Sequence, residues 1–339
     1  MKVAIVGATG AVGRDLISLI ENRNFPVSEL VLFASERSLG SSISFKEKSL
    51  PIQILKKNSL EGFDIAFFSA GSKVAKHYAP LAVASGAVVI DNSSAFRLDP
   101  VVPLIIPEVN PEALWNHKGI IANPNCATII LLMALAPLHK RKKIKRMVVS
   151  TYQAASGAGA KGVEDLLQET HSFFTKETYH RQVVPFPYAF NLFLHNSALK
   201  DNTYNEEEWK IICESKKILK DDQIGITATC VRVPVIRAHC ESVNVQFHEY
   251  FSAKEAYEIL SSSPGIKILE DKLENRFPMP IDAIGQSDIF CGRIREDISQ
   301  PFTLDLWIVG DQILKGASLN AIQIAETMLK IKHPNQPKR

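Results

Sequence analysis

The chain has 339 residues, of which 46% are hydrophobic and 22% are charged, with a formal net charge of +3. This length suggests roughly two domains, and the composition is that of a globular protein with enough apolar residues for a full core. The near-neutral charge excludes a general affinity for polyanions, and the longest apolar run, 129–137, is too short to span a membrane.

The N-terminal part of the chain alternates short apolar strands with amphipathic helices. Strands are predicted at 2–6, 30–34, 65–69, 87–90 and 119–122, and helices at 14–22 and 74–85. Glycines or small polar residues follow the carboxyl ends of these strands, as at 7–13, 70–72 and 91–94. This alternation predicts an α/β fold with a Rossmann-type, doubly wound parallel sheet.

The pattern changes near Arg146, where longer segments of alternating hydrophobicity begin. Strands are predicted at 147–152, 226–233, 243–247 and 303–308, which is typical of a mixed or antiparallel sheet with one face on helices. We therefore expect a second, α+β domain. Residues 1–125 with the C-terminal helix in 316–339 would form the dinucleotide-binding domain, and 126–315 the second domain. The tail after His333 is expected to be frayed.

The segment Gly7 to Gly13 has the spacing G-x-x-G-x-x-G between a strand and a helix. Backbone N–H groups in such a turn can bind a pyrophosphate, although glycines there can also serve tight packing alone. The second strand is followed by Ser35-Glu36-Arg37-Ser38. Arg37 between hydroxyls suits a 2′-phosphate, whereas Glu36 could accept from a ribose hydroxyl. We expect NADP rather than NAD.

Cys126 lies in Asn123-Pro124-Asn125-Cys126, ahead of an apolar stretch. Pro124 disfavours helix at Asn123 and Asn125 is a good N-cap, so Cys126 is predicted at the first helical position. The partial positive charge there favours a thiolate, although a lone cysteine can also be a buried structural residue. Beside a nicotinamide site, a reactive thiol predicts aldehyde oxidation through a thioester, which water or phosphate then resolves.

This chemistry needs a general base, and His239 is the candidate, where an apolar strand gives way to a polar turn. A solvated or core histidine is the alternative. The basic run 139–146 fits a solvated helix end without aromatic residues for base stacking, so we expect no nucleic-acid partner. The five cysteines form no C-x-x-C pair or zinc spacing, so we expect no metal, reduced thiols and a cytoplasmic protein without a signal peptide.

Taken in order, the motifs closely resemble the aspartate-semialdehyde dehydrogenase family. The matching segments are GATGAVG at 7–13, SERS at 35–38, SSAFR at 93–97, NPNCAT at 123–128, TYQAASGAG at 151–159, EEEWK at 206–210, RVPV at 232–235 with the following His239, and KGASLNAIQIAE at 315–326. The resemblance implies an NADP-dependent, phosphorylating aldehyde dehydrogenase that makes L-aspartate 4-semialdehyde from 4-phospho-L-aspartate and releases inorganic phosphate. It would serve lysine (diaminopimelate), threonine and methionine biosynthesis as a homodimer, formed through the second, catalytic domain.

The resemblance also implies roles for individual residues. Cys126 aligns with the nucleophile, Gln153 with the residue that orients the thioester, and His239 with the acid/base. The implied substrate residues are Arg232 for the α-carboxylate, Glu207 for the ammonium, Arg97 and Lys210 for phosphate, and also Asn125 and Ser156. The implied cofactor residues are Gly7, Thr9, Gly10, Ala11, Val12, Gly13, Ser35, Arg37, Ser38, Gly71, Gly157, Gly159 and Asn320. Without the resemblance, Arg97, Glu207 and Lys210 would be interpreted as surface charges.

Some positions depart from the family pattern. The family commonly has Ser where this chain has Ala127, and Gly-His-Ser where it has Ala238-His239-Cys240. Two alternatives stay open. One is an N-acetyl-γ-glutamyl-phosphate reductase, although that family usually has Gly-Cys-Tyr around its nucleophile. The other is a catalytically silent paralogue with a binding or regulatory role, which the retained Cys126, Gln153 and His239 disfavour.

Overall fold

The computed structural model describes residues 1–330 and divides into two compact units. The first is formed by Met1–Asn125 and the segment from Ala317 onward, and the second by Cys126–Gly316. Residues 331–339, which include the tail predicted to be frayed, lie outside the described residues. Within residues 1–330, no helix is both long enough and apolar enough to cross a membrane.

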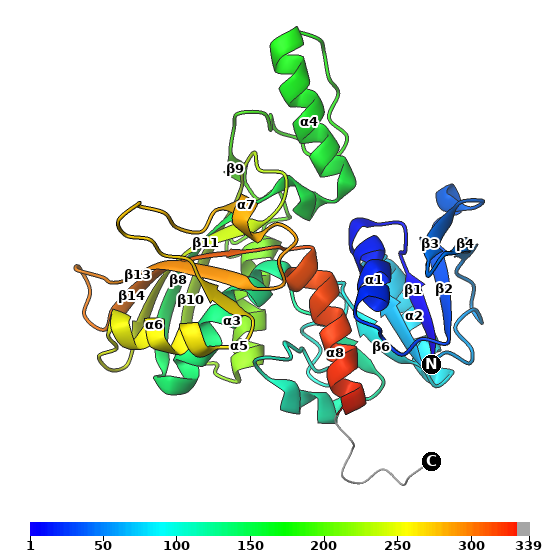
Figure 1. Ribbon diagram of the computed structural model, residues 1–339, viewed down its shortest axis with the longest axis horizontal. Coiled ribbons are helices and arrows are strands. Elements are labelled where there is room, and N and C mark those ends of the chain that lie inside the picture. The colour runs from blue at the N-terminus through cyan, green and yellow to red at the C-terminus, as the bar shows by residue number, and fades with distance from the viewer. Residues whose placement is uncertain (331–339) are drawn as a thin grey trace. The chain divides into compact units, whose positions relative to one another are not determined.

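The first unit is built around a seven-stranded sheet (Figure 1). Its strands are β1 (Lys2–Val6), β2 (Glu29–Ala34), β3 (Ser42–Phe45), β4 (Lys48–Ile54), β5 (Ile65–Phe68), β6 (Val88–Asp91) and β7 (Ile120–Ala122). Its helices are α1 (Ala11–Asn22), α2 (Ser72–Ala84) and α8 (Leu319–Lys330), with short 3-10 turns η1 (Glu36–Ser38) and η2 (Pro111–Asn116).

The order of the first sheet is β3-β4-β2-β1-β5-β6-β7, and every pair except β3 with β4 is parallel. The chain proceeds to one side of β1 through β2 and β4, then continues on the other side with β5. Val3 and Ile5 pack with α1 and α8 on one face, while Ala4 and Val6 pack with α2 on the other. The prediction of a doubly wound, Rossmann-type sheet is confirmed. Its topological switch point lies between β1 and β5, where such folds bind ligands.

The second unit has a mixed seven-stranded sheet in the order β12-β13-β14-β11-β8-β10-β9. The strands are β8 (Ile144–Gln153), β9 (Phe193–Leu194), β10 (Gly225–Arg232), β11 (His239–Phe247), β12 (Ile266–Ile268), β13 (Ile289–Glu296) and β14 (Thr303–Gly310). The helices are α3 (Cys126–Arg141), α4 (Ala160–Thr175), α5 (Glu206–Leu219), α6 (Ala253–Ser262) and α7 (Pro280–Ala283), with a 3-10 turn η3 (Ala155–Ala158). A π-helical turn, η4 (Leu314–Ser318), crosses the boundary between the units.

Helices α3, α5 and α6 pack on the second sheet, with the apolar α3 in contact with β8, β13 and β14. Side chains of β8 alternate between this buried face and a more open one, as Thr151 and Tyr152 show. On the open face, the ring of Tyr152 packs against Trp307. Helix α4 projects away from the sheet of its unit (Figure 1). The expected mixed sheet with one face on helices is confirmed.

Several predicted boundaries differ from the structure, and two of these differences bear on the site. Helix α1 begins at Ala11 rather than Arg14, because Gly13 lets the first turn of the helix pack directly against the backbone of the preceding loop. Strand β11 begins at His239 rather than Val243, because Cys240 pairs with Tyr152 and Val309 on the neighbouring strands. His239 therefore opens a central strand and does not lie in a polar turn.

Candidate active site

A cavity of about 620 Å³ lies at the switch point of the first sheet. It is lined by the carboxyl ends of β1, β2 and β5, by the end of β4, and by side chains of α2. Of the predicted cofactor residues, it brings together Gly7, Thr9, Gly10, Ser35 and Arg37. The lining residues of α2, Val74 and Tyr78, were not predicted. They lie far along the chain from the glycine-rich turn, and no local sequence pattern connects the two segments.

Two glycines of the G-x-x-G-x-x-G motif are required by close packing. Gly7 has a φ of +94°, and a Cβ atom there would lie 2.5 Å from the backbone oxygen of Ser69. A Cβ atom at Gly13 would lie 2.2 Å from the backbone oxygen of Gly7. These contacts bring the start of α1 and the ends of β1 and β5 together. Gly10, which lines the cavity, is the N-cap of α1, and the first N–H groups of a helix have no partner within the helix. The residues present therefore fit a bound dinucleotide.

Arg37 and Glu36 lie side by side at the cavity, in the turn η1 that follows β2. The hydroxyl groups of Thr9 and Ser38 lie 3.3 Å apart and so connect the glycine-rich turn to η1. The other predicted cofactor residues of this unit do not line the cavity. Gly71 precedes α2, Ala11, Val12 and Gly13 lie in the first turn of α1, and Asn320 lies in α8.

Asn320 takes part in a buried amide network beneath the segment that precedes Cys126. Its side-chain nitrogen donates to the Asn123 side chain at 2.6 Å and to the Ile105 carbonyl at 2.9 Å. Asn123 in turn donates to the Asn92 side chain at 2.8 Å and to the Ala317 carbonyl at 3.1 Å. Asn320 therefore helps to hold this segment in place, and its role at the cofactor stays a prediction.

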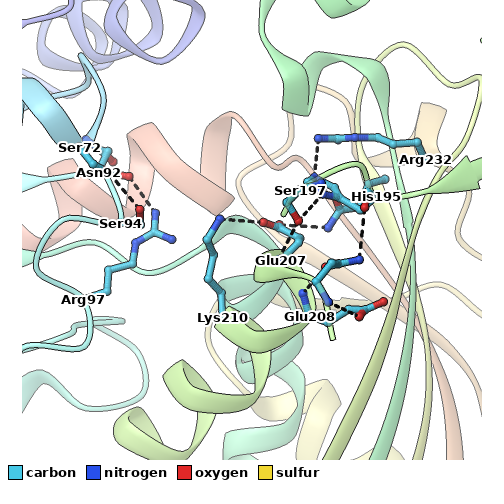
Figure 2. Close-up of polar contacts among 12 residues, drawn as sticks. Ser72, Asn92, Ser94, Arg97, His195, Ser197, Glu207, Glu208, Lys210 and Arg232 are labelled. Atoms are coloured by element: carbon cyan, nitrogen blue, oxygen red, sulfur yellow. Dashed lines mark hydrogen bonds and ion pairs between the residues drawn. The ribbon is translucent and has the colours of Figure 1, made fainter. Parts of the chain in front are cut away.

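Arg97 joins the same network and is only 8% exposed. Its Nε donates to the Asn123 carbonyl at 2.9 Å, and its NH2 group donates to the Asn92 carbonyl at 2.8 Å. Figure 2 shows Arg97 together with Asn92, Ser72 and Ser94, whose hydroxyls lie 3.0 Å apart. The interpretation of Arg97 as a surface charge was wrong, because its guanidinium is buried and held by two backbone carbonyls.

Cys126 is the first residue of α3, as predicted, and its side chain is partly exposed. The backbone of Gly316 lies against it, so that a Cβ atom at Gly316 would be 3.1 Å from the Cβ of Cys126. The Asp311 carbonyl fixes this segment by accepting from the Gly316 N–H at 3.0 Å. Cys230, Cys240 and Cys291 differ from Cys126, because they are buried and burial raises their pKa values. Cys213 is partly exposed like Cys126, and burial raises its pKa as well.

Gln153, Glu207 and Lys210 form a connected polar group in the second unit. Gln153 ends β8, and its side-chain nitrogen donates to Oε1 of Glu207 at 3.3 Å. Lys210, one turn along α5, donates to the other oxygen of Glu207 at 3.2 Å (Figure 2). Glu207 is only 6% exposed, so its interpretation as a surface charge was also wrong. A buried carboxylate with these partners can bind a cationic group.

Arg232 and His239 lie on either side of the backbone of Ala154. Arg232 is 5% exposed, and its NH1 group donates to the Ala154 carbonyl at 3.1 Å. The Ala154 N–H donates to Nδ1 of His239 at 3.0 Å. Neutral His239 therefore carries its proton on Nε2, which is buried without a hydrogen-bond partner among the described residues. This N–H is available to a ligand.

Gly157 completes this part of the site. A Cβ atom there would lie 2.7 Å from NH1 of Arg232 and 3.2 Å from Nε2 of His239. The structure thus places Gly157 at the predicted carboxylate-binding and acid/base residues. Gly159, two residues further along, is the N-cap of α4, and no atom would lie within 4 Å of a Cβ atom at this position.

Burial controls the protonation of both histidines in this unit. Burial, together with the positive charge of Arg232, lowers the pKa of His239 to about 3. It also lowers the pKa of His195 to about 4, against the opposing effect of Glu207. Both imidazoles are therefore neutral at physiological pH. Burial raises the pKa of Tyr188 to about 12, against the opposing effect of the Arg232 charge, so the Tyr188 hydroxyl stays protonated.

Ser156 and Ala238 are connected through Gln312. The side-chain nitrogen of Gln312 donates to the Ser156 hydroxyl, and its oxygen accepts from the Ala238 N–H at 2.9 Å. Ala238 has a φ of +76°, a conformation that favours glycine. The departure from the family's usual Gly-His-Ser therefore places strain directly before His239.

Two site residues were missed from the sequence, His195 and Ser197. His195 accepts a hydrogen bond from Arg232, and Ser197 accepts one from the Glu207 N–H (Figure 2). Both follow the two-residue strand β9, which is too short to predict. By contrast, the first turn of α5 carries a readable capping box, Asn205 with Glu208, which could have placed Glu207 at a helix N-terminus.

Comparisons with known proteins find matches for both units of the chain. Residues 2–117 match the family described as "Semialdehyde dehydrogenase, NAD binding domain", and residues 135–315 match "Semialdehyde dehydrogenase, dimerisation domain". The aspartate-semialdehyde dehydrogenase of Synechocystis sp. is 51% identical over 330 residues, which cover 97% of this chain and 98% of that protein. The enzyme of the same name from Aquifex aeolicus is 49% identical, with the same coverage.

The fold is also similar to solved structures. The crystal structure of aspartate semialdehyde dehydrogenase II from Vibrio cholerae, complexed with ASA, superposes with a TM-score of 0.94. The two proteins are 40% identical, and the match covers 97% of this chain and 98% of that one.

Proposed function

This chain belongs to the aspartate-semialdehyde dehydrogenase family, and we propose that it interconverts 4-phospho-L-aspartate and L-aspartate 4-semialdehyde. The observation that carries the proposal is the buried polar cluster of Gln153, Glu207, Arg232 and His239 in the unit that begins at Cys126. A carboxylate and a guanidinium in one buried cluster, with a histidine whose Nε2–H has no hydrogen-bond partner among the described residues, support recognition of an α-amino acid.

Substrate recognition rests on two buried charges of opposite sign. Arg232 makes one hydrogen bond through each terminal nitrogen, which leaves three of its five N–H groups for a substrate α-carboxylate. Glu207 would bind the ammonium group. A buried carboxylate at this position favours aspartyl over N-acetylglutamyl substrates. An acetylated nitrogen is neutral, so it would bring no cation to the buried Glu207 charge.

The chemistry would begin with attack of the Cys126 thiolate on the acyl carbon, forming a C–S bond and breaking the bond to the phosphate oxygen. When bound, NADPH would supply the hydride that reduces the resulting thioester. Gln153 would orient the thioester oxygen, and the Nε2–H of His239 would stabilise the negative charge that develops on it. Cleavage of the C–S bond then regenerates the thiolate and releases the aldehyde.

Arg97 and Lys210 are the proposed phosphate ligands. Each is a cation held by its own unit, Arg97 by two backbone carbonyls and Lys210 by Glu207. Holding the charge in place before phosphate arrives reduces the entropy lost on binding. In the first unit, Arg37 at the cavity supports NADP as the cofactor, because its guanidinium can pair with a 2′-phosphate.

The match of residues 135–315 to a dimerisation domain supports a dimer, and we propose a homodimer formed through this domain. A cytoplasmic location is supported by the five cysteines, none of which forms a disulfide within the described chain.

The experiment that tests the function is NADP⁺ reduction by the purified protein with L-aspartate 4-semialdehyde, with and without inorganic phosphate. Rapid reduction that depends on phosphate is expected. Reduction independent of phosphate would contradict the roles given to Arg97 and Lys210. Absence of reduction by protein that still binds NADP⁺ would refute the substrate, and the N-acetylated glutamyl analogue would then be assayed alongside.

A further inference from the structure

His195 connects two parts of the second unit through its backbone. Its N–H donates to the Cys230 carbonyl on β10 at 2.8 Å. Its carbonyl accepts from the Asn205 side chain, the N-cap of α5, at 3.3 Å. The residue is therefore fixed between the strand that ends at Arg232 and the helix that begins at Glu206.

The side chain of His195 continues the connection. The NH2 group of Arg232 donates to Nε2 of His195 at 2.8 Å (Figure 2). Because a guanidinium only donates hydrogen bonds, Nε2 must be the unprotonated nitrogen. Nδ1 then carries the hydrogen. The Ser197 hydroxyl, 3.1 Å away, can accept this hydrogen, whereas the Ser197 backbone nitrogen, 3.2 Å from Nδ1, is itself a donor and cannot. The Ser197 hydroxyl also accepts from the Glu207 N–H at 3.1 Å.

We propose that His195 is a positioning residue that makes Arg232 and the first turn of α5 one hydrogen-bonded unit. The carboxylate-binding and ammonium-binding groups of an α-amino acid site are thereby held at a fixed separation. This inference rests on the function proposed above, since it assigns those two groups to Arg232 and Glu207. Neither His195 nor Ser197 needs to touch the substrate for this role.

The role of His195 matters because Arg232 has few other anchors. Its guanidinium has two anchors, the Ala154 carbonyl on NH1 and His195 on NH2. Loss of the second would leave a long side chain held at one nitrogen and free to rotate about that bond. The His195 imidazole can accept from Arg232 because burial keeps it neutral at physiological pH. The charges of Arg232 and Lys210 also favour the neutral form, whereas the charge of Glu207 opposes it.

The test compares His195→Ala with His195→Gln and with His248→Ala, a control at an exposed histidine of the same unit. A hydrogen bond to a charged group corresponds to a loss of about 10- to 100-fold when it is removed. We expect His195→Ala to lower kcat/KM for L-aspartate 4-semialdehyde by that factor, mainly through KM, with KM for NADP⁺ unchanged. His195→Gln should restore most of the loss, because its amide can accept from Arg232 and donate to Ser197.

Two further measurements separate positioning from general stability. Ser197→Ala removes only the link to Glu207 and should give a smaller loss than His195→Ala, at an unchanged melting temperature. Propionaldehyde, which lacks both recognised groups, should be oxidised equally by wild type and His195→Ala. If wild type turns over the semialdehyde and His195→Ala matches it, or if His195→Gln is as impaired as His195→Ala, the inference is wrong. If wild type itself fails to turn over the semialdehyde, the proposed function is wrong instead.

Discussion

Gly157→Ala should impair catalysis while leaving the fold intact. The added Cβ would lie 2.7 Å from NH1 of Arg232, whereas unstrained carbon and nitrogen atoms lie about 3.5 Å apart. NH1 must therefore retreat by about 0.8 Å. Its hydrogen bond to the Ala154 carbonyl is already 3.1 Å long, so this retreat takes it beyond the usual range of about 2.7–3.2 Å.

The cost falls on function because the displaced atom is the end of a flexible side chain. Losing one anchor of a charged group lowers kcat/KM by about 10- to 100-fold, and crowding of His239 adds to that loss. The assay is kcat/KM for L-aspartate 4-semialdehyde beside a thermal melt.

Gly225→Ala, at the opposite end of β10 from Arg232, is the matched control, because its Cβ would make only ordinary contacts at 3.6 Å. Wild-type kcat/KM in Gly157→Ala, or equal losses in both variants, would refute the reasoning.

Three other changes have predictable outcomes. Arg37→Leu should lower the preference for NADP⁺ over NAD⁺ by about 10- to 100-fold, measured as the ratio of kcat/KM values, by removing a charge-assisted contact to the 2′-phosphate. Burial raises the pKa of Glu241 well above its usual value, and neither carboxylate oxygen has a hydrogen-bond partner within residues 1–330. The folded state therefore favours the protonated form, so stability is full below the unfolded pKa of about 4.3 and falls by about 1.4 kcal/mol per pH unit above it, toward the folded pKa. Urea unfolding between pH 5 and 8 should show this slope reduced in Glu241→Gln; an unchanged slope would contradict it. Ala238→Gly should raise the free energy of unfolding by about 0.5–1 kcal/mol, because relief of the left-handed φ outweighs the added chain entropy, and a lower melting temperature would refute this.

The sequence predicts those parts of the site that depend on local chemistry. Cys126 begins a helix because Pro124 and Asn125 stop the preceding segment and an apolar run follows. The glycine-rich turn could be placed because it lies directly between a strand and a helix. Both signals extend over fewer than about ten residues, the range in which backbone preferences act.

The burial of Arg97 and Glu207 could not be predicted in this way. Arg97 is buried because its guanidinium donates to the backbone carbonyl of Asn92, five residues earlier in the same loop, and to that of Asn123, in the segment before α3. Strand β13 was missed because Gly292 and the left-handed Arg293 interrupt its alternation at a shift of register. Each case depends on contacts between distant segments, for which composition and periodicity give no signal.

The arrangement of the acid/base and carboxylate-binding groups depends above all on sheet register. Arg232 pairs directly with Gln153 in the parallel ladder of β10 and β8, and Cys240 pairs with Tyr152 in the antiparallel ladder of β11 and β8. Since side chains alternate between faces, a slip of one residue would send Arg232 to the opposite face from Gln153. The buried alternation along β8 prevents such a slip, because it would also expose the apolar row that packs on α3. The hydrophobic pattern of the second sheet therefore fixes its catalytic end, and substitutions that weaken this pattern should impair substrate binding before they unfold the chain.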